Sequence, residues 1–262
     1  MEKILFVGAG NMGSAIMGGI FKQYDLFALE PNADQRLFLE KNYSIPSFAH
    51  PDEIQNWQEW NAIFLAIKPQ QLQEVAPCLK VHKNTFVISI LAGKTTEHLS
   101  AMLKTKKIIR AMPNTPALIH RAVVGLFAHA HTTENEKNLT QKLFEHIGKT
   151  LWLNDENQMD AITALSGSGP AYVFYFLESL MYSAQTFGFD ESTAKMLALE
   201  TLLGSGLLAQ QQMLPFSQLR ENVTSKGGTT EAALNVLKEE HFQNIVHRAI
   251  LAAQKRSMEL NN

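Results

Sequence analysis

The chain has 262 residues, 45% of them hydrophobic, with 23 Lys or Arg against 25 Asp or Glu and a formal net charge of −2. This length exceeds one typical domain, and the hydrophobic fraction excludes extensive disorder. The near balance of charge creates no basic field, so we expect neither a nucleic acid nor an anionic membrane surface as a partner.

Cysteine usage and the N-terminus bear on the compartment. Cys78 is the only cysteine, so no intrachain disulfide forms, which is typical of a reducing environment. The first apolar run is too short for a signal peptide and ends at Gly8. No stretch reaches the roughly 18 apolar residues of a membrane span. We therefore expect a soluble, cytoplasmic protein with no membrane partner.

The first part of the chain alternates short β-rich runs with amphipathic helical patterns. The predicted strands are 4–7, 26–29, 62–67, 85–90, 107–111, 123–127 and 150–153, and the predicted helices are 11–21, 33–41, 70–79, 96–103 and 134–147. This alternation indicates a parallel sheet with helices on both faces.

The β-rich runs stop near residue 154. The remaining predicted elements are helices at 155–165, 171–187, 191–212, 216–223, 230–237 and 241–260. The change predicts an α/β dinucleotide-binding domain over residues 1–154 and an all-α domain over residues 155–262.

A glycine-rich motif follows the first predicted strand. Gly8-Ala9-Gly10-Asn11-Met12-Gly13 fits the pattern G-x-G-x-x-G between a strand and a helix. Gly8 permits the tight turn, Gly10 lets the backbone approach a pyrophosphate, and Gly13 allows close helix–strand packing. The helix N-terminus offers free N–H groups to phosphate. Rather than a plain glycine-rich turn, we predict the dinucleotide site of a Rossmann domain, with contacts from Gly8, Gly10, Asn11, Met12 and Gly13.

The end of the second predicted strand meets the cofactor ribose in such domains. Glu30 lies there. A carboxylate at this point accepts the 2′-hydroxyl of NAD and repels the 2′-phosphate of NADP. However, Arg36 on the next helix would accommodate a phosphate if Glu30 turned away. We assign Glu30 and Asn32 to the cofactor site, and these residues leave NAD and NADP both open.

Two further strand ends lie at the same edge of the predicted sheet. Ala66-Ile67-Lys68-Pro69 ends one strand and Ile90-Leu91-Ala92-Gly93 ends another. Carboxyl ends of parallel strands face the cofactor. The alternative for Lys68 is a solvated lysine ahead of a proline-started helix. The cofactor residues expected from these strand ends are Ala66, Lys68, Pro69, Leu91 and Ala92.

The segment Ser225-Lys226-Gly227-Gly228-Thr229-Thr230 precedes a predicted helix. Two glycines and three hydroxyls form a nest of donors that suits a carboxylate or a phosphate. The equally open alternative is an ordinary helix–helix turn with Thr229 or Thr230 as the N-cap. By contrast, His129-Ala130-His131 offers a metal ion only two ligands, so we expect no metal site.

Together these segments resemble the 1-pyrroline-5-carboxylate reductase family along essentially the whole chain. Besides the glycine loop and Ala66–Pro69, the resemblance rests on Arg110-Ala111-Met112-Pro113-Asn114-Thr115-Pro116, on Leu165-Ser166-Gly167-Ser168-Gly169-Pro170-Ala171 and on residues 219–230. The chain departs from the family at Lys226, where proline is usual, at Leu214-Pro215, where histidine-proline is frequent, and at Glu30, which is unusual beside a preference for NADP.

The resemblance implies an N-terminal α/β Rossmann domain and an all-α C-terminal dimerisation domain that interlocks with its twin, so the homodimer is the minimal unit. It favours NADP, used as NADPH, with NAD possible. It implies hydride transfer from the reduced nicotinamide to the C=N bond of 1-pyrroline-5-carboxylate, giving L-proline. It places Thr230 as the catalytic hydroxyl beside the ring nitrogen. The implied substrate-binding residues are Asn114, Ser225, Gly227, Gly228, Thr229 and Thr230.

Two other functions compete with this reading. A β-hydroxyacid dehydrogenase would share the glycine loop, but its catalytic lysine would fall at Val173, counted from Gly169, and its asparagine at Leu177. A non-catalytic redox sensor would need the glycine loop and a protein partner, but not the Ser225–Thr230 nest. Stabilisation by proline beyond the effect of cofactor separates the reductase from the sensor.

Overall fold

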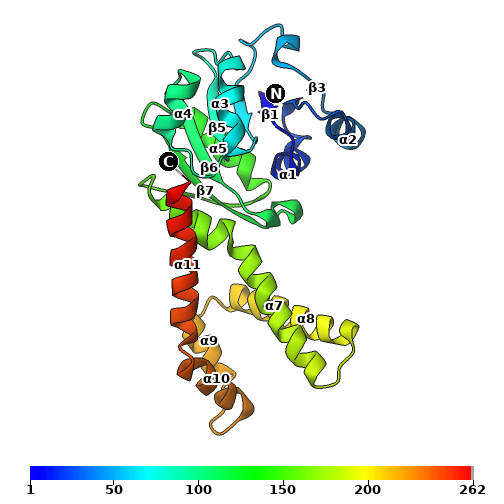
Figure 1. Ribbon diagram of the computed structural model, residues 1–262, viewed down its shortest axis with the longest axis vertical. Coiled ribbons are helices and arrows are strands. Elements are labelled where there is room, and N and C mark those ends of the chain that lie inside the picture. Colours follow the sequence, from blue (N-terminus) through cyan, green and yellow to red (C-terminus); the bar gives the residue numbers. More distant parts are fainter. Residues whose placement is uncertain (261–262) are drawn as a thin grey trace. The chain divides into compact units, whose positions relative to one another are not determined.

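The computed structural model describes residues 1–260 and contains two compact units (Figure 1). The α/β unit comprises Met1–Ser168 and the C-terminal segment that begins at Ala253, and the helical unit comprises Gly169–Ala252. The C-terminal segment thus belongs to the unit formed by the first part of the chain.

The α/β unit is built on one eight-stranded sheet. Its strands are β1 (Lys3–Val7), β2 (Asp25–Leu29), β3 (Ser47–Phe48), β4 (Ala62–Leu65), β5 (Phe86–Ser89), β6 (Ile108–Met112), β7 (Ala122–Ala128) and β8 (Gly148–Trp152). The order in the sheet is β3-β2-β1-β4-β5-β6-β7-β8. All neighbouring pairs are parallel except β6 and β7, which are antiparallel.

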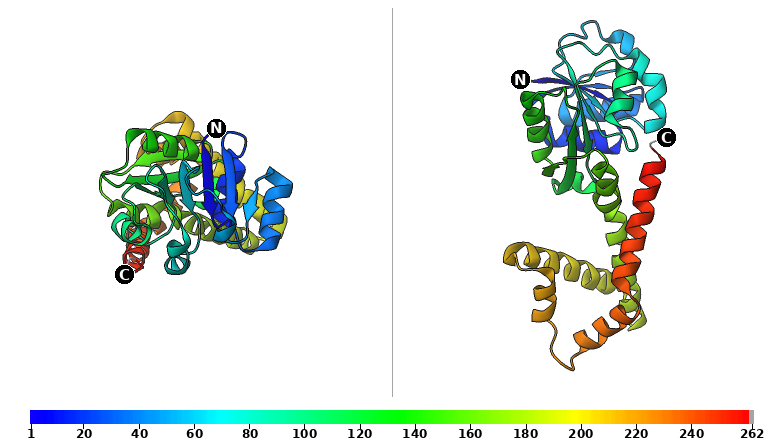
Figure 2. Two further views of the ribbon diagram at one scale, coloured as in Figure 1. Left: turned by 90° about the horizontal axis from the view of Figure 1, so that it is seen from above. Right: turned by 90° about the vertical axis from the view of Figure 1, so that its left-hand side faces the viewer.

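Helices cover both faces of this sheet (Figure 2). The helices of the unit are α1 (Asn11–Ile20), α2 (Ala33–Tyr43), α3 (Leu72–Val75), α4 (Thr96–Leu103), α5 (Glu134–Glu145) and α6 (Gln158–Ile162). Alternate strand residues feed two cores: Phe6 and Phe64 pack with α1, α2 and α5, while Leu5 and Ile63 pack with α3 and α4. The strands are buried on both faces, which explains their continuous apolar sequences.

The predicted parallel sheet is therefore confirmed except at one pair of strands. Only residues 113–121 connect β6 to β7, and they contain the 3-10 turn Thr115–Ile119. A parallel return needs a crossover of about a dozen residues or more, so this connection is too short for one. The sequence also gave no sign of β3, which has only two residues.

The predicted helix 155–165 is shorter and continues differently. Residues Gln158–Ile162 form α6, and Thr163–Gly167 form a π-helical turn in which the N–H of Ser168 donates to the carbonyl of Thr163 at 2.8 Å. Met159, Asp160 and Ala164 are buried. Because of this burial, the compact α/β unit extends past the predicted domain boundary after residue 154.

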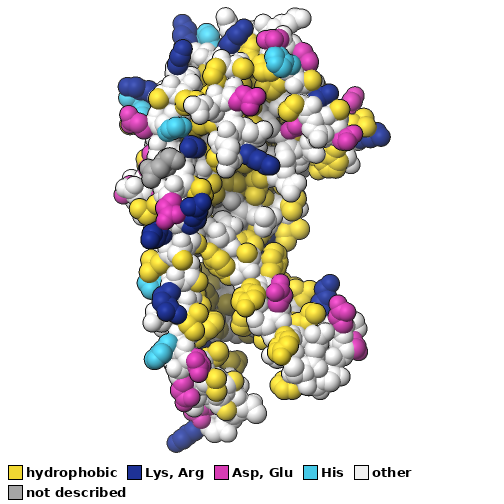
Figure 3. Space-filling view, in the orientation of Figure 1, with side chains coloured by type: hydrophobic (Ala, Val, Ile, Leu, Met, Phe, Trp, Pro, Cys, Tyr) yellow, Lys and Arg dark blue, Asp and Glu magenta, His cyan; other side chains and the backbone are white. Residues whose placement is uncertain are grey.

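The helical unit contains α7 (Gly169–Thr186), α8 (Glu191–Gln212), α9 (Phe216–Asn222), α10 (Thr229–Glu239) and the larger part of α11 (Phe242–Glu259). The residues Gly169–Ala252 are all described, and among them only Ala194 and Ala198 are buried. Large apolar side chains stay exposed on every helix, for example Tyr175, Leu207 and Phe216. Hydrophobic side chains accordingly crowd the helical surface in Figure 3. This unit alone leaves its apolar surface in water.

Candidate active site

The strand ends singled out from the sequence meet at one edge of the sheet. β2, β1, β4, β5 and β6 lie side by side and run in the same direction. The order of strands reverses between β1 and β4, and ligands of such sheets bind outside the carboxyl ends at this reversal. Gly8 follows β1 and Ala66 follows β4, so the glycine loop lies at the reversal.

The three glycines of the loop have the properties that the sequence motif predicts. Gly8 has φ +92°, and a Cβ there would lie 2.8 Å from the carbonyl oxygen of Ala66. A Cβ on Gly13 would lie 2.9 Å from the carbonyl oxygen of Gly8. A Cβ on Gly10 would meet nothing within 4 Å. Gly10 therefore faces open space, as a backbone that receives a pyrophosphate must.

The start of α1 is available to an anion. Gly10 is the N-cap of α1, and no side chain caps this helix. The first turn contains Asn11, Met12 and Gly13, and it has no acidic residue. Backbone N–H groups at an uncapped helix start, with the positive end of the helix dipole, form a phosphate site. The residues present therefore fit a dinucleotide.

Glu30 is held against the glycine loop. Its Oε2 accepts a hydrogen bond from the N–H of Ala9 at 2.8 Å, and its Oε1 accepts one from the N–H of Asn32 at 2.9 Å. Ala9 is also held through its carbonyl, which accepts a hydrogen bond from the hydroxyl of Ser14 at 2.7 Å. Glu30 thus fixes the loop as well as standing at the end of β2.

A cation contacts the backbone at the end of β2. Arg36 donates from Nη1 to the carbonyls of Glu30 and Pro31, both at 2.8 Å. Asn32 is the N-cap of α2, with its Oδ1 accepting from the N–H of Gln35 at 3.0 Å. The end of β2 therefore carries a carboxylate and, close by, a guanidinium, each fixed by hydrogen bonds.

A pocket of about 360 Å³ opens at this edge of the sheet. Five predicted cofactor residues line it, namely Gly8, Gly10, Glu30, Ala66 and Lys68. The sequence did not single out the remaining lining residues, which are Val7, Leu29, Pro31, Ala49, His50, Pro51, Ile67, Gln71, Glu74, Val75 and Cys78. Ala49–Pro51 could have been predicted only from their place directly after β3. That strand has two residues, which is too short for a strand pattern to be recognised in the sequence.

The other predicted cofactor residues lie outside that pocket lining. Pro69 starts the 3-10 turn Pro69–Gln71 that follows Lys68. Leu91 is buried in the core, so only its backbone is free to face a ligand, while Ala92 is half-buried. Asn11, Met12, Gly13 and Asn32 lie at the starts of α1 and α2, beside the loop.

Asn114 uses its side chain within the protein. Its Nδ2 donates to the carbonyl and the hydroxyl of Ser166, each at 3.1 Å, and its Oδ1 accepts from the N–H of Val123 at 3.0 Å. The residue is buried. Asn114 therefore ties the end of β6 to β7 and to the π-helical turn, a role that the sequence did not predict.

The Ser225–Thr230 segment forms a tight turn in the helical unit. Gly227 has φ +72°, and the N–H of Gly228 donates to the carbonyl of Ser225 at 3.0 Å. Gly228 is the N-cap of α10, and no side chain caps this helix, so neither Thr229 nor Thr230 is the predicted N-cap. Among residues 1–260 no hydrogen bond involves the Thr230 hydroxyl.

Glu231 is a residue of this turn that the sequence analysis missed. Its Oε2 accepts a hydrogen bond from the N–H of Gly227 at 2.7 Å. A carboxylate thus already occupies one donor of the segment. Among residues 1–260, the N–H groups of Thr229 and Thr230 at the start of α10 have no hydrogen-bond partner, so these are the donors that the turn leaves to a ligand.

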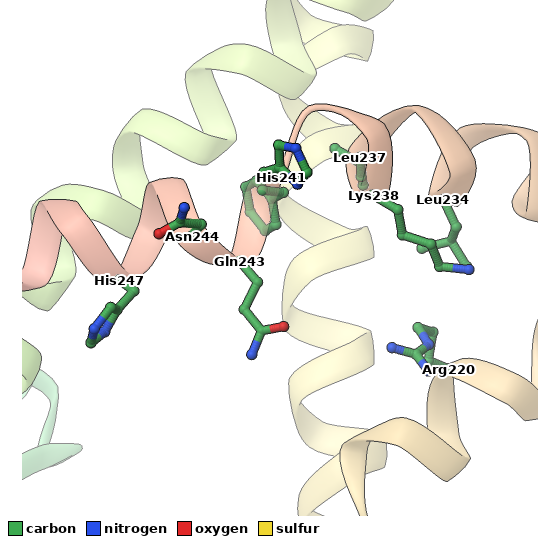
Figure 4. Close-up of a pocket in the computed structure, with 9 residues that line it drawn as sticks. Arg220, Leu234, Leu237, Lys238, His241, Gln243, Asn244 and His247 are labelled. Carbon is green, nitrogen blue, oxygen red and sulfur yellow. The ribbon is translucent and has the colours of Figure 1, made fainter.

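A second cavity of about 680 Å³ lies among α9, α10 and α11 (Figure 4). Arg220 and Lys238 extend into it, with His241 and His247 on the side of α11. None of the predicted site residues lines it. It is part of the exposed surface of the helical unit and does not contain the Ser225–Thr230 turn.

The described chain has neither a metal-binding cluster nor a membrane-spanning helix. Residues 1–260 hold no cluster of three or more His, Cys, Asp or Glu side chains placed to bind a metal ion. No helix in the same range combines the length and apolar character required to cross a bilayer. Cys78 is exposed and unpaired by disulfide.

Two family models match the chain. The model described as pyrroline-5-carboxylate reductase dimerisation matches residues 156–260. The model described as NADP oxidoreductase, coenzyme F420-dependent, matches residues 3–93. The first identifies the helical part as a dimerisation domain of a homo-oligomer, and the second covers the glycine loop and the pocket at the sheet edge.

Curated relatives match over nearly their whole length. A pyrroline-5-carboxylate reductase of Haemophilus influenzae is 38% identical over 98% of this chain and 97% of its own. That of Pasteurella multocida is 39% identical over 99% of this chain and 98% of its own.

Solved structures agree with these relatives. A pyrroline-5-carboxylate reductase from Coxiella burnetii is 33% identical, with a TM-score of 0.89 over 99% of this chain and 98% of its own. The pyrroline carboxylate reductase from Plasmodium falciparum, solved with NADP bound, is 29% identical, with a TM-score of 0.86 over 100% of this chain and 98% of its own. These matches confirm the predicted fold class and the family resemblance: the chain belongs to the pyrroline-5-carboxylate reductase family.

Proposed function

We propose that this chain reduces the C=N bond of 1-pyrroline-5-carboxylate with hydride from NADPH and forms L-proline. The α/β unit supplies the cofactor site, and the helical unit supplies the substrate site on Ser225–Thr230. The observation that carries the proposal is the start of α10, which no side chain caps and which follows Gly227 at positive φ.

The glycine loop supports the cofactor half of the proposal. Gly8, Gly10 and Gly13 have the turn, the open face and the close packing that a pyrophosphate site needs. Bound there, a reduced nicotinamide dinucleotide supplies the hydride. The protein needs no covalent nucleophile for this step, so orientation of the two reactants provides most of the acceleration.

NADP is the favoured cofactor, with weak discrimination against NAD. Arg36 lies fixed beside the end of β2 and offers a cation to a 2′-phosphate, whereas Glu30 repels it. The family model named for NADP oxidoreductases and the NADP-bound relative support this preference. The opposed charges are the reason for expecting only weak discrimination.

The turn before α10 anchors the substrate carboxylate. Backbone N–H groups of Thr229 and Thr230, the first two residues of α10, receive the carboxylate, and the positive end of the α10 dipole adds to their attraction for an anion. The Ser225 hydroxyl lies against Gly228, where a Cβ would be 2.5 Å away. A side chain at Gly228 would therefore displace the Ser225 hydroxyl.

Thr230 is the polar partner of the ring nitrogen. The imine accepts hydride more readily once its nitrogen is protonated, and a hydroxyl beside it helps to hold that proton. A threonine hydroxyl is too weak an acid to be the proton source, so water supplies the proton. Asn114 serves the site indirectly, by fixing the end of β6.

Replacement of Thr230 tests the proposal. Thr230→Ala should lower kcat/KM by about tenfold, because a hydrogen bond worth about 1.4 kcal/mol is lost. It should leave the NADPH dissociation constant unchanged, because the cofactor is bound by the other unit. Thr230→Ser, which keeps the hydroxyl, should recover most of the activity.

Thr201→Ala is the matched control, since its hydroxyl only donates to the carbonyl of Leu197 on exposed α8. Steady-state kinetics and cofactor titration measure both effects. Wild-type activity in Thr230→Ala would make Thr230 an ordinary helix residue. Joint loss of cofactor binding and turnover would make the turn a structural support.

A further inference from the structure

The loop Leu91–Gly93, which follows β5, contains a glycine in the left-handed region of backbone conformation. Gly93 is buried with φ +66°. The N–H of Leu91 donates to the hydroxyl of Ser89 at 3.3 Å, and the Leu91 side chain enters the core. These contacts fix Leu91, the first residue of the loop. They do not involve Ala92 or Gly93, which other parts of the chain must hold in place.

Glu156 secures the chain just after the loop. Its Oε1 accepts from the N–H of Thr96 at 2.6 Å and from Nη1 of Arg110 at 2.8 Å, and its Oε2 accepts from the Thr96 hydroxyl at 2.8 Å. The Arg110 side chain is 4% exposed and that of Glu156 is 23% exposed, so this is a partly buried ion pair at the start of α4. The beginning of α4 is thereby fastened to β6.

The end of α11 supports the loop itself. A Cβ on Gly93 would lie 2.7 Å from the carbonyl oxygen of Leu260 and 2.9 Å from its Cβ. Gly93 is therefore covered by the last described turn of the chain. The absence of a side chain at Gly93 lets that turn approach the loop so closely.

Ser257 attaches this turn to the α/β unit. Its hydroxyl donates to Oδ1 of Asp160 at 2.6 Å. Both residues are buried, with Ser257 4% and Asp160 9% exposed, while the neighbouring Met258 is 55% exposed. Ser257 is the buried side chain of α11. Because its hydroxyl makes a short hydrogen bond to a buried carboxylate, Ser257 anchors a helix end that is otherwise mostly exposed.

We propose that the last turn of the described chain, Ser257–Leu260, is a positioning element for the cofactor loop Leu91–Gly93, and that Ser257 is its positioning residue. The inference rests on the proposed function, because it takes this loop as part of the cofactor site. Loss of the Ser257 hydroxyl frees the turn, and Gly93, with its permissive backbone, then loses the contact that holds it in one conformation.

Cofactor titration of Ser257→Ala in the full chain tests this. The NADPH dissociation constant, followed by nicotinamide fluorescence, should rise about threefold to tenfold, the factor expected for one lost hydrogen bond. The KM for pyrroline-5-carboxylate should stay near wild type, since that substrate is bound elsewhere. Ser257→Thr, which keeps the hydroxyl, should restore NADPH affinity. Met258→Ala, on the exposed side of the same turn, is the control.

A second variant guards against a folding defect. Leu260→Gly removes the Cβ that lies against Gly93 from a residue that is 43% exposed, and it should weaken NADPH binding in the same direction without lowering the Tm. An unchanged dissociation constant in folded Ser257→Ala and Leu260→Gly overturns the proposal, as does a lowered Tm with normal affinity, which is what a merely structural contact produces.

Ala92→Leu separates this inference from the function on which it rests. If Ala92→Leu weakens NADPH binding and the two α11 variants do not, the loop belongs to the cofactor site but α11 does not position it. If none of the three variants changes NADPH affinity, the loop itself lies outside the cofactor site and both statements fall. Weakening in all three supports the proposal.

Discussion

At the scale of single residues, Glu30 connects the end of β2 to the glycine loop, because its carboxylate accepts hydrogen bonds from the N–H groups of Ala9 and Asn32. Its place at the end of β2 followed from the spacing to the glycine loop. Its hydrogen bond to Ala9 did not, because it depends on how two loops approach each other in space. The same holds for Asn114, whose motif suggested a ligand contact although its amide is satisfied by Ser166 and Val123. Sequence locates such residues, while packing decides which of their atoms remain free.

Gly10 offers a direct test of the phosphate loop. Gly10→Val should fold normally, because Gly10 has an extended backbone conformation and nothing within 4 Å of a new Cβ. It should weaken NADPH binding by about tenfold or more, or 1.4 kcal/mol, because the side chain fills the space of the pyrophosphate. Isothermal titration and a melting curve measure both.

Gly8→Ala is the contrasting variant. Its Cβ would meet the Ala66 carbonyl and its φ is positive, so the Tm itself should fall. Normal NADPH affinity in a folded Gly10→Val protein would exclude the loop from the cofactor site.

Glu30 controls cofactor choice in our interpretation. Glu30→Ser should raise the ratio of kcat/KM for NADPH over NADH by about tenfold, since repulsion between two charges a few ångströms apart is worth more than 1 kcal/mol. The ratio is the informative quantity, because loss of the bond to Ala9 should weaken both cofactors.

Glu30→Gln is the matched control for that loss. It removes the charge but keeps a carbonyl that accepts from Ala9. It should therefore shift the ratio in the same direction while weakening binding less. An unchanged ratio in both variants would mean that Glu30 does not face the ribose.

At the scale of elements, the period of the hydrophobic pattern predicted most strands and helices to within a few residues. It failed where neighbours in space decide the structure. The direction of β7 depends on the short connection from β6, and the π-helical turn Thr163–Gly167 depends on packing against the sheet. The return of α11 to the α/β unit involves one buried serine, which has no signature in a helical pattern.

The start of α8 gives a prediction that depends on pH. Asp190 is its N-cap, and hydrogen bonds from the Ser192 hydroxyl and from the N–H and hydroxyl of Thr193 lower the pKa of Asp190 from 3.8 to about 2. Because the folded-state pKa is the lower one, the ionised carboxylate stabilises the fold fully above pH 3.8. That contribution disappears as the pH falls through about 2.

Asp190→Ala should therefore lower the Tm at pH 7 and lose less further stability on acidification than the wild type. Asp190→Asn keeps a capping oxygen and should retain the Tm at pH 7 without the pH dependence. Melting curves from pH 7 down to pH 2.5 compare the three proteins. Identical acid profiles for all three would show that the cap does not contribute.

At the scale of the whole molecule, the helical unit lacks a core of its own. Exposed fractions of 72% for Tyr175 and 82% for Phe216 are far from those of a folded helical domain. A contiguous apolar surface of this kind marks an obligate interface. It agrees with the dimerisation family that matches residues 156–260.

Leu203→Glu, in the middle of exposed α8, should disrupt this assembly, because a buried unpaired charge is strongly unfavourable. We expect a smaller species by light scattering and a parallel loss of reductase activity. Glu200→Gln, one turn earlier, is the control and should remain dimeric. A fully active monomer at matched concentration would contradict the link between assembly and activity.

The bond between Ser257 and Asp160 joins residues 97 positions apart, and this separation matters while the protein is being made. A ribosome releases the glycine loop early, so the half of the sheet that receives a pyrophosphate can form on the nascent chain. The end of α11 is synthesised after every other element that the structure describes. In our proposal, a growing chain thus acquires its phosphate-binding loop long before the loop after β5 gains its support from α11.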